Sequence, residues 1–130
     1  MNITLPPHIE DTEQLYRAFP GSNPNLWKAD LKRFTSAIFK DSLGCSVDRD
    51  GGRTKETIIE VFAERKPGFG LACINAGDCR AEDAHLVAKP EENNPYHAEI
   101  HDSKSSVEIT SKGKARRLAK KTHLVKYPEQ

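Results

Sequence analysis

The chain has 130 residues and a mass of 14.5 kDa, which is the size of one ordinary domain with a single core. Hydrophobic residues make up 36% of it and charged residues 30%, with 20 Lys and Arg against 19 Asp and Glu. No apolar run approaches the roughly 20 residues of a membrane span, and the first residues lack the pattern of a signal peptide. These features argue against a membrane protein, a secreted disulfide scaffold and a coiled coil. They predict a small globular domain in the cytoplasm.

The N-terminal segment, residues 1–13, is polar and contains Pro6 and Pro7. We expect it to be a flexible arm. No repeat or low-complexity tract divides the remainder, so residues 14–130 are expected to form one α+β domain.

Short segments of strand character recur along this domain. Large and polar side chains alternate from Leu15 to Phe19, as they do in a half-buried strand. Turns rich in Gly, Pro, Asn and Asp separate the segments. Further strands are expected over residues 35–39, 45–47, 69–76, 84–88 and 105–110, and a short turn of helix over 27–33. For residues 97–101 both a strand and a helix stay open.

The clearest helix is expected over residues 55–65. Thr54 is a suitable N-cap, Arg65 lies at the end where the helix dipole favours cations, and Pro67-Gly68 ends the segment. Its large apolar residues fall on one face at helical spacing. With the short strands, this pattern predicts an α+β fold: a small, mostly antiparallel sheet, one well-defined central helix and a basic C-terminal helix.

The three cysteines, Cys45, Cys73 and Cys79, are an odd number and form no CxxC pair. We therefore expect reduced thiols, with no zinc site, disulfide or cofactor. Cys73 lies in an apolar run and is expected to be buried. Cys79 follows a turn-prone segment and is expected to be exposed.

Charge is distributed unevenly along the chain. Residues 1–110 hold 13 Lys and Arg against 18 Asp and Glu, whereas residues 111–130 hold seven cations and one anion. Ser111 is a suitable N-cap for a final helix over 111–126. Six cations form its predicted binding surface: Lys112, Lys114, Arg116, Arg117, Lys120 and Lys121. Such a surface suits an acidic protein partner or nucleic acid, and the alternative is a solvated helix that offsets the acidic body.

Two histidines and a glutamate lie close together in the segment 97–101. In a strand His97, Glu99 and His101 share one face, because successive side chains point to opposite sides. A helix would also place His97 and His101 on one face, but Glu99 would then lie elsewhere. Three interpretations are open: a solvated polar face, acid–base or substrate-contacting residues, and a transition-metal site. The spacing is not that of the HExxH zinc motif, and we predict no metal.

Arg17 lies in the first predicted strand, and a guanidinium can clamp a phosphate through two parallel hydrogen bonds. Its placement, with Ser36 and Phe39 following, resembles the opening of ADP-ribosyltransferase-like domains. That resemblance implies that Arg17 holds a dinucleotide phosphate, although no glutamate stands in the strand context that this family uses. The alternative is an ion pair with one of the acidic residues.

Two functions follow from these features. The first is a small cytoplasmic binding or regulatory module that contacts a partner, either protein or nucleic acid, through its basic C-terminal helix. The second is a small enzyme that acts on a phosphorylated or nucleotide substrate, by ADP-ribosyltransferase-like or acid–base chemistry, using Arg17 and the face of His97, Glu99 and His101. An enzyme should bring Arg17 and His97 into one pocket, whereas a binding module should leave the histidine face flat and open.

Overall fold

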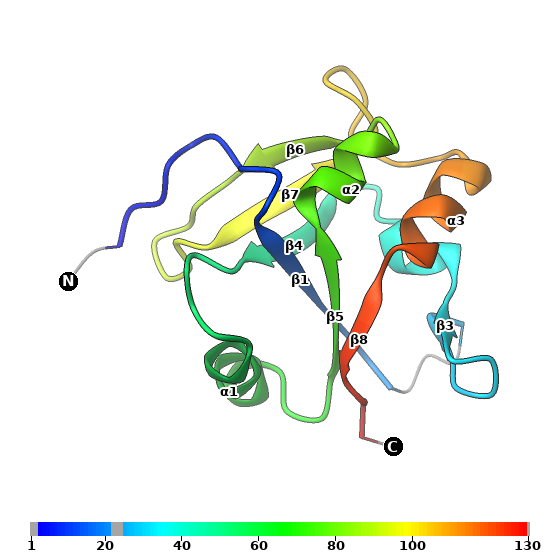
Figure 1. The fold of residues 1–130 in the computed structure, drawn as a ribbon, viewed down its shortest axis with the longest axis horizontal. Helices are drawn as coiled ribbons and strands as arrows, with labels where there is room; N and C mark the ends of the chain where they lie inside the picture. The colour runs from blue at the N-terminus through cyan, green and yellow to red at the C-terminus, as the bar shows by residue number, and fades with distance from the viewer. Residues whose placement is uncertain (1–2, 22–24, 130) are drawn as a thin grey trace.

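A computed structural model of the chain describes residues 3–21 and 25–129. Its centre is a six-stranded antiparallel sheet with the strand order β6-β7-β4-β1-β5-β8 (Figure 1). This architecture confirms the predicted α+β class. The strands of this sheet are β1 (Gln14–Phe19), β4 (Cys45–Arg49), β5 (Gly70–Asn75), β6 (His85–Ala88), β7 (His97–His101) and β8 (His123–Lys126).

Four helical segments and a small hairpin accompany the sheet. They are η1 (Ser36–Phe39), α1 (Lys55–Arg65), α2 (Ala76–Ala81), α3 (Lys112–Lys120) and the two-stranded pair β2 (Trp27–Lys28) and β3 (Arg33–Phe34). The predicted helix over 55–65 is confirmed with its cap, because the Thr54 hydroxyl accepts a hydrogen bond from the backbone N–H of Thr57.

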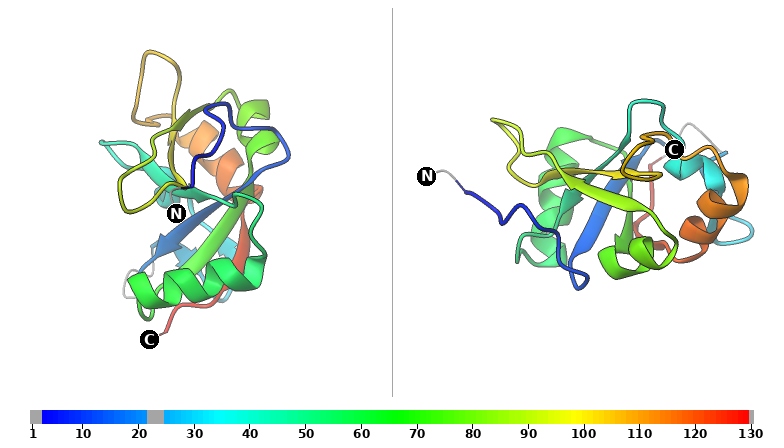
Figure 2. Two further views of the ribbon diagram at one scale, coloured as in Figure 1. Left: turned by 90° about the vertical axis from the view of Figure 1, so that its left-hand side faces the viewer. Right: turned by 90° about the horizontal axis from the view of Figure 1, so that it is seen from above.

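Hydrophobic side chains pack on both faces of the sheet. The larger cluster joins Leu15 and Ile100 of the sheet to Leu118 of α3 and Cys79 of α2. A smaller cluster on the opposite face packs Ile58 and Phe62 of α1 against β1 and β5. Figure 2 shows α1 separated by the sheet from α2 and α3. The sheet is therefore the middle layer, with α2 and α3 packed on one face and α1 on the other.

The register places three polar or aromatic side chains on the α1 face. Tyr16 of β1 pairs with Asp48 of β4, which pairs in turn with His97 of β7. Directly paired residues point to the same side of a sheet. Because α1 packs over β1 and β5, the part of this face on β4 and β7 borders the helix and lies beside a groove.

Several segments differ from the sequence-based predictions. Residues 27–33 form the β2–β3 hairpin in place of a helical turn, and residues 105–110 form no strand. The segment 35–39 is the 3₁₀-helix η1 because the Thr35 side chain caps it, accepting a hydrogen bond from the N–H of Ala37. These local side-chain bonds compete with a sheet ladder.

The C-terminal helix is shorter than the predicted range 111–126. Ser111 caps it as expected, but α3 ends at Lys120 and residues His123–Lys126 form the edge strand β8. Pairing with β5 satisfies backbone groups of this segment, and Leu124 packs against the larger core cluster. Tertiary packing thus overrides the weak helical pattern at this end.

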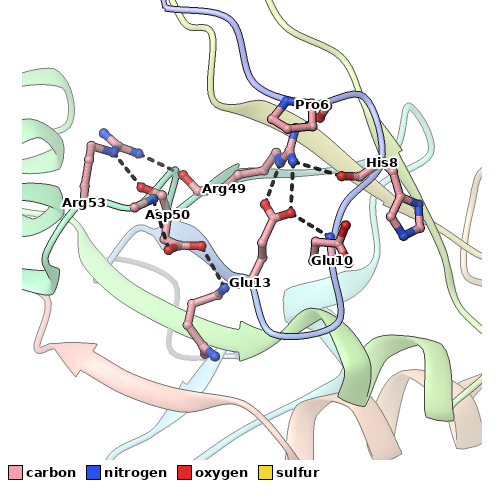
Figure 3. A network of polar contacts seen from close by, with 9 residues as sticks. Pro6, His8, Glu10, Glu13, Arg49, Asp50 and Arg53 are labelled. Atoms are coloured by element: carbon pink, nitrogen blue, oxygen red, sulfur yellow. Dashed lines mark hydrogen bonds and ion pairs between the residues drawn. The ribbon is translucent and has the colours of Figure 1, made fainter.

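Arg49 is almost fully buried and holds part of the N-terminal arm (Figure 3). Its guanidinium donates to the carbonyl oxygens of Pro6, at 2.7 Å, and His8, at 3.3 Å. Ile9 follows these residues and is buried in the core. The arm is therefore packed against β4 from Pro6 onward in this structure, while its predicted flexibility in solution stays a prediction.

All three cysteines are free and buried. The prediction that Cys79 is exposed is wrong, because α2 turns its side chain into the core, where its exposed fraction is 0%. Asn75 starts this short helix by accepting a hydrogen bond from the N–H of Asp78. The turn signal of residues 76–78 therefore marks a helix start.

Candidate functional site

A groove of about 590 Å³ lies between the C-terminal end of α1 and the neighbouring strands β1, β4 and β7. Its lining combines cations, neutral polar groups and aromatic rings with a single carboxylate. The chemically distinctive members are Arg17, Arg65, Lys66, His97, Asp48, Ser46, Asn94, Tyr16 and Phe62. The structure thus brings Arg17 and His97, predicted from separate sequence features, into one groove.

Arg17 stands where β1 and β4 separate. The two strands pair only at Leu15 with Arg49 and at Tyr16 with Asp48. Beyond that point the Arg17 guanidinium bridges the gap, donating from Nε to the carbonyl of Ile38 at 2.7 Å and from Nη1 to that of Ser46 at 2.8 Å.

These bonds use two of the five N–H donors of the Arg17 guanidinium. Within the described part of the chain, Nη2 of Arg17 makes no hydrogen bond. The side chain is not paired with a carboxylate there either, which differs from the simple ion pair considered as the alternative. It is a cation whose orientation these two bonds fix at the gap between β1 and β4.

Asp48 is the one carboxylate among the described groove residues, and it is 4% exposed. It accepts hydrogen bonds from Nη2 of Arg65 at 2.8 Å and from Nδ2 of Asn94 at 3.0 Å. These contacts tie the end of α1 and the loop before β7 to β4. Because Arg65 compensates Asp48, the charges of Arg17 and Lys66 give the groove a positive excess.

The orientation of His97 is set by a backbone carbonyl. Nδ1 lies 2.9 Å from the carbonyl oxygen of Lys89, and a carbonyl can only accept, so Nδ1 carries the proton and donates it. In the neutral ring Nε2 then keeps its lone pair. A histidine held in this tautomer can accept a proton at Nε2 from a group bound in the groove.

Glu99 and His101 form a separate pair on the same strand. The Glu99 carboxylate lies 2.7 Å from Nε2 of His101 and 3.5 Å from Nζ of Lys89. Burial raises the pKa of Glu99, but the hydrogen bond to His101 and the charge of Lys89 outweigh burial and hold the pKa below its usual value. Neither residue is among those lining the groove.

The strand 97–101 therefore does not present one joint site in this structure. His97 lies at the groove, whereas Glu99 and His101 satisfy each other. Among the described residues, no group of three or more His, Cys, Asp or Glu side chains is arranged to hold a metal ion. A shared acid–base role for all three side chains stays a prediction.

The six cations of the predicted C-terminal surface fall into two sets. Lys114 donates to the carbonyls of Asp83 and Asp102, and Arg117 and Lys121 both contact the carboxylate of Glu82, at 2.7 and 2.8 Å. The other three cations are exposed and make no ion pair within the described residues: Lys112, Arg116 and Lys120.

A second cavity of about 620 Å³ lies between the N-terminal arm and the loop that precedes β7. Apolar and proline side chains such as Leu5, Pro7 and Pro90 make up much of its wall, with Glu91 and Glu92 at its edge. Within its described lining, Arg49 is the one cation and is already bound to Glu13. This second cavity therefore offers fewer reactive groups than the groove beside α1.

Seven of these distinctive groove residues were not predicted from the sequence: Tyr16, Ser46, Asp48, Phe62, Arg65, Lys66 and Asn94. Arg65 was interpreted only as a cation that complements the helix dipole, and Phe62 lies on what was interpreted only as the apolar face of that helix. Two cations just after an apolar helix face are a weak signal of such a site. The signal gains meaning only when α1 is known to dock beside Arg17 and His97.

Comparisons with protein-family models, curated proteins and solved structures find no match to this chain. In the described residues, no helix combines the length and apolar character that crossing a membrane requires. Function is therefore argued from the residues of the groove and of α3 alone.

Proposed function

We propose that the protein is a small enzyme that binds a phosphorylated or nucleotide substrate in the groove beside α1. The observation that carries this proposal is that Arg17 and His97 line the same groove. Arg17 supplies oriented donors for phosphate oxygens, since charge-assisted bonds from a guanidinium suit that group. Lys66, exposed at the end of α1, adds a second positive charge.

His97 is the proposed general acid–base. Its Nδ1–H is held by the Lys89 carbonyl, so Nε2 is the nitrogen that exchanges a proton with the substrate or a water molecule. Acid–base chemistry suits this groove better than ADP-ribosyl transfer, because no glutamate is among its described lining residues.

The binding half of this proposal is tested by titrating ADP and inorganic phosphate into the ¹⁵N-labelled protein. We expect ADP to shift the amide signals of Arg17, Ser46 and His97, and Lys66→Gln to weaken binding several-fold. Lys112→Gln removes an exposed cation from α3 and serves as the matched control, with no expected effect. Shifts that avoid the groove, or equal weakening by both variants, would contradict the proposal.

The catalytic half is tested with His97→Gln. Turnover of phosphorylated probes, followed by ³¹P NMR, should be lost in this variant while ADP binding persists. The melting temperature should change little, since substitutions of this kind usually cost no more than about 1 kcal/mol. A fall of many degrees would instead identify His97 as a structural residue through its bond to Lys89.

A second candidate function is a binding module that contacts a partner through α3. The observation that favours it is the row of three exposed cations, Lys112, Arg116 and Lys120. A cytoplasmic location is part of both proposals, because three free, buried thiols fit a reducing compartment.

A further inference from the structure

The exposed cations of α3 form a regular row. Lys112, Arg116 and Lys120 follow one another at intervals of four residues, and all three are exposed. In an α-helix this interval corresponds to about 6 Å along the axis and to the same face, so the row is about 12 Å long. We define these three residues as the α3 row.

The helix that carries the row is firmly attached to the domain. Ala115, Leu118 and Ala119 are buried against the core. Lys114 is bound to Asp102, and Arg117 and Lys121 are bound to Glu82. Three of the six cations thus form ion pairs within the domain. The α3 row is the positive charge of this helix that can contact another molecule.

The composition of the exposed face indicates the kind of partner. The exposed residues of α3 are Lys112, Gly113, Arg116, Arg117 and Lys120. Arg117 is already bound to Glu82, and none of the five has an apolar or aromatic side chain. Protein interfaces depend on buried apolar or aromatic anchors, and their cores are depleted of lysine. Stacking on unpaired bases also requires aromatic rings. A face of cations alone instead suits the phosphates of a double helix.

We infer that the α3 row contacts the phosphate backbone of duplex nucleic acid without reading its sequence. This inference rests on the second candidate function and names its partner. Successive phosphates of one strand lie about 3.4 Å apart along the duplex axis, so the row spans about four nucleotides. Three phosphate contacts release counterions, which gives a slope of log K against log salt of about −2.7.

The test measures binding of a labelled 20-base-pair DNA duplex by fluorescence anisotropy over a range of low to moderate salt. The test variant is Lys112→Gln with Lys120→Gln, and the matched control is Arg117→Gln with Lys121→Gln. Both remove two charges from α3, but the control residues are already paired with Glu82. We expect the test variant to lose about 1.8 of the slope and the control to keep nearly all of it.

Equal losses in the two variants would overturn the inference, because only net charge would then matter. Absence of duplex binding at low salt would overturn it as well. Poly-glutamate is added as a competitor: if it displaces the duplex at equal charge, the α3 row does not select duplex phosphates and the inference is overturned, whereas the second candidate function survives. Vesicles of neutral lipid with phosphatidylserine that bind as tightly as the duplex would also overturn the choice of nucleic acid.

Discussion

Glu13 holds Arg49 through both of its carboxylate oxygens: Nε of Arg49 lies 2.7 Å from Oε1 and Nη2 lies 2.9 Å from Oε2. The arginine side chain is 4% exposed and the glutamate side chain 16%. The same guanidinium also binds carbonyls of the N-terminal arm. One buried charge therefore joins β4, the start of β1 and the arm, and its compensation depends on Glu13.

Glu13→Gln should destabilise the protein clearly, because it leaves the Arg49 charge buried without its anion. Breaking a buried ion pair costs about 3–5 kcal/mol, and the partial exposure of Glu13 places the expected loss near the lower end of that range. Urea unfolding followed by circular dichroism measures it.

Asp11→Asn is the matched control for this experiment. Asp11 also binds an arginine, Arg80, at 2.6 Å, but the two side chains are 72% and 31% exposed. Exposed pairs contribute about 0–1 kcal/mol. Similar losses of unfolding free energy in Glu13→Gln and Asp11→Asn would contradict the prediction, because the burial of Arg49 would then add nothing to the effect.

The lowered pKa of Glu99 predicts that the protein loses stability in acid. Its pKa lies below the usual 4.5 because contacts with His101 and Lys89 outweigh burial. The unfolded chain therefore takes up this proton at a higher pH than the folded chain. The stabilising contribution is complete above a pH of about 4.5 and is lost as the pH falls through the lower pKa of the folded state.

Thermal unfolding from about pH 6 to about pH 3 tests this linkage. Glu99→Gln lacks the ionisable group, so its stability deficit relative to the parent should shrink as the pH falls. Glu92→Gln changes an exposed carboxylate in the loop before β7 and should follow the parent throughout. A deficit for Glu99→Gln that stays constant with pH would contradict the assignment of this contribution to ionisation.

Local signals predicted the parts of the fold that local interactions determine. The helix over 55–65 was predicted from Thr54, its apolar face and Pro67-Gly68, and alternation predicted β1, whereas residues 97–101 could not be assigned to a strand or a helix. The end of α3 could not be predicted in this way, since residues 123–126 form a strand only because β5 offers them a partner. Burial of Cys79 likewise depends on how α2 packs.

The groove likewise combines residues that local signals could indicate with residues whose position depends on long-range packing. Arg17 and His97 were chosen from their chemistry and their strands, but their common site depends on the order β7-β4-β1, which joins segments far apart in the chain. Arg65 and Phe62 lie at the groove because α1 packs beside that part of the sheet. No periodicity in the sequence reports such long-range packing.

The cysteines should be unreactive in the folded protein. Burial raises the pKa of Cys45 and of Cys73 to about 11 and that of Cys79 to about 12, and thiol reagents require the thiolate. Titration with Ellman's reagent should detect almost no thiol in the native protein and three in denaturant. A reductant should leave the melting temperature unchanged, because all three thiols are free. Rapid labelling of any native cysteine would contradict this prediction.

Arg17 should contribute to folding as well as to ligand binding. Arg17→Met leaves the carbonyls of Ser46 and Ile38 without the donors that bridge the gap between β1 and β4. Hydrogen bonds from charged groups contribute about 1.5–3 kcal/mol, so we expect a loss of about 2–3 kcal/mol in the free energy of unfolding. Arg17→Lys keeps the charge but has no planar fork to reach both carbonyls, and its loss should be smaller.

The two roles of Arg17 are separated by measuring thermal stability with and without ADP. A ligand that binds only the folded state raises the melting temperature, so ADP should stabilise the parent and stabilise Arg17→Lys much less. Arg33→Met removes an exposed arginine from β3 and should match the parent in both measurements. If Arg17→Met unfolds at the parental temperature, the bridging hydrogen bonds contribute nothing net to stability. If ADP stabilises Arg17→Lys as much as the parent, the guanidinium is not the phosphate donor that the groove requires.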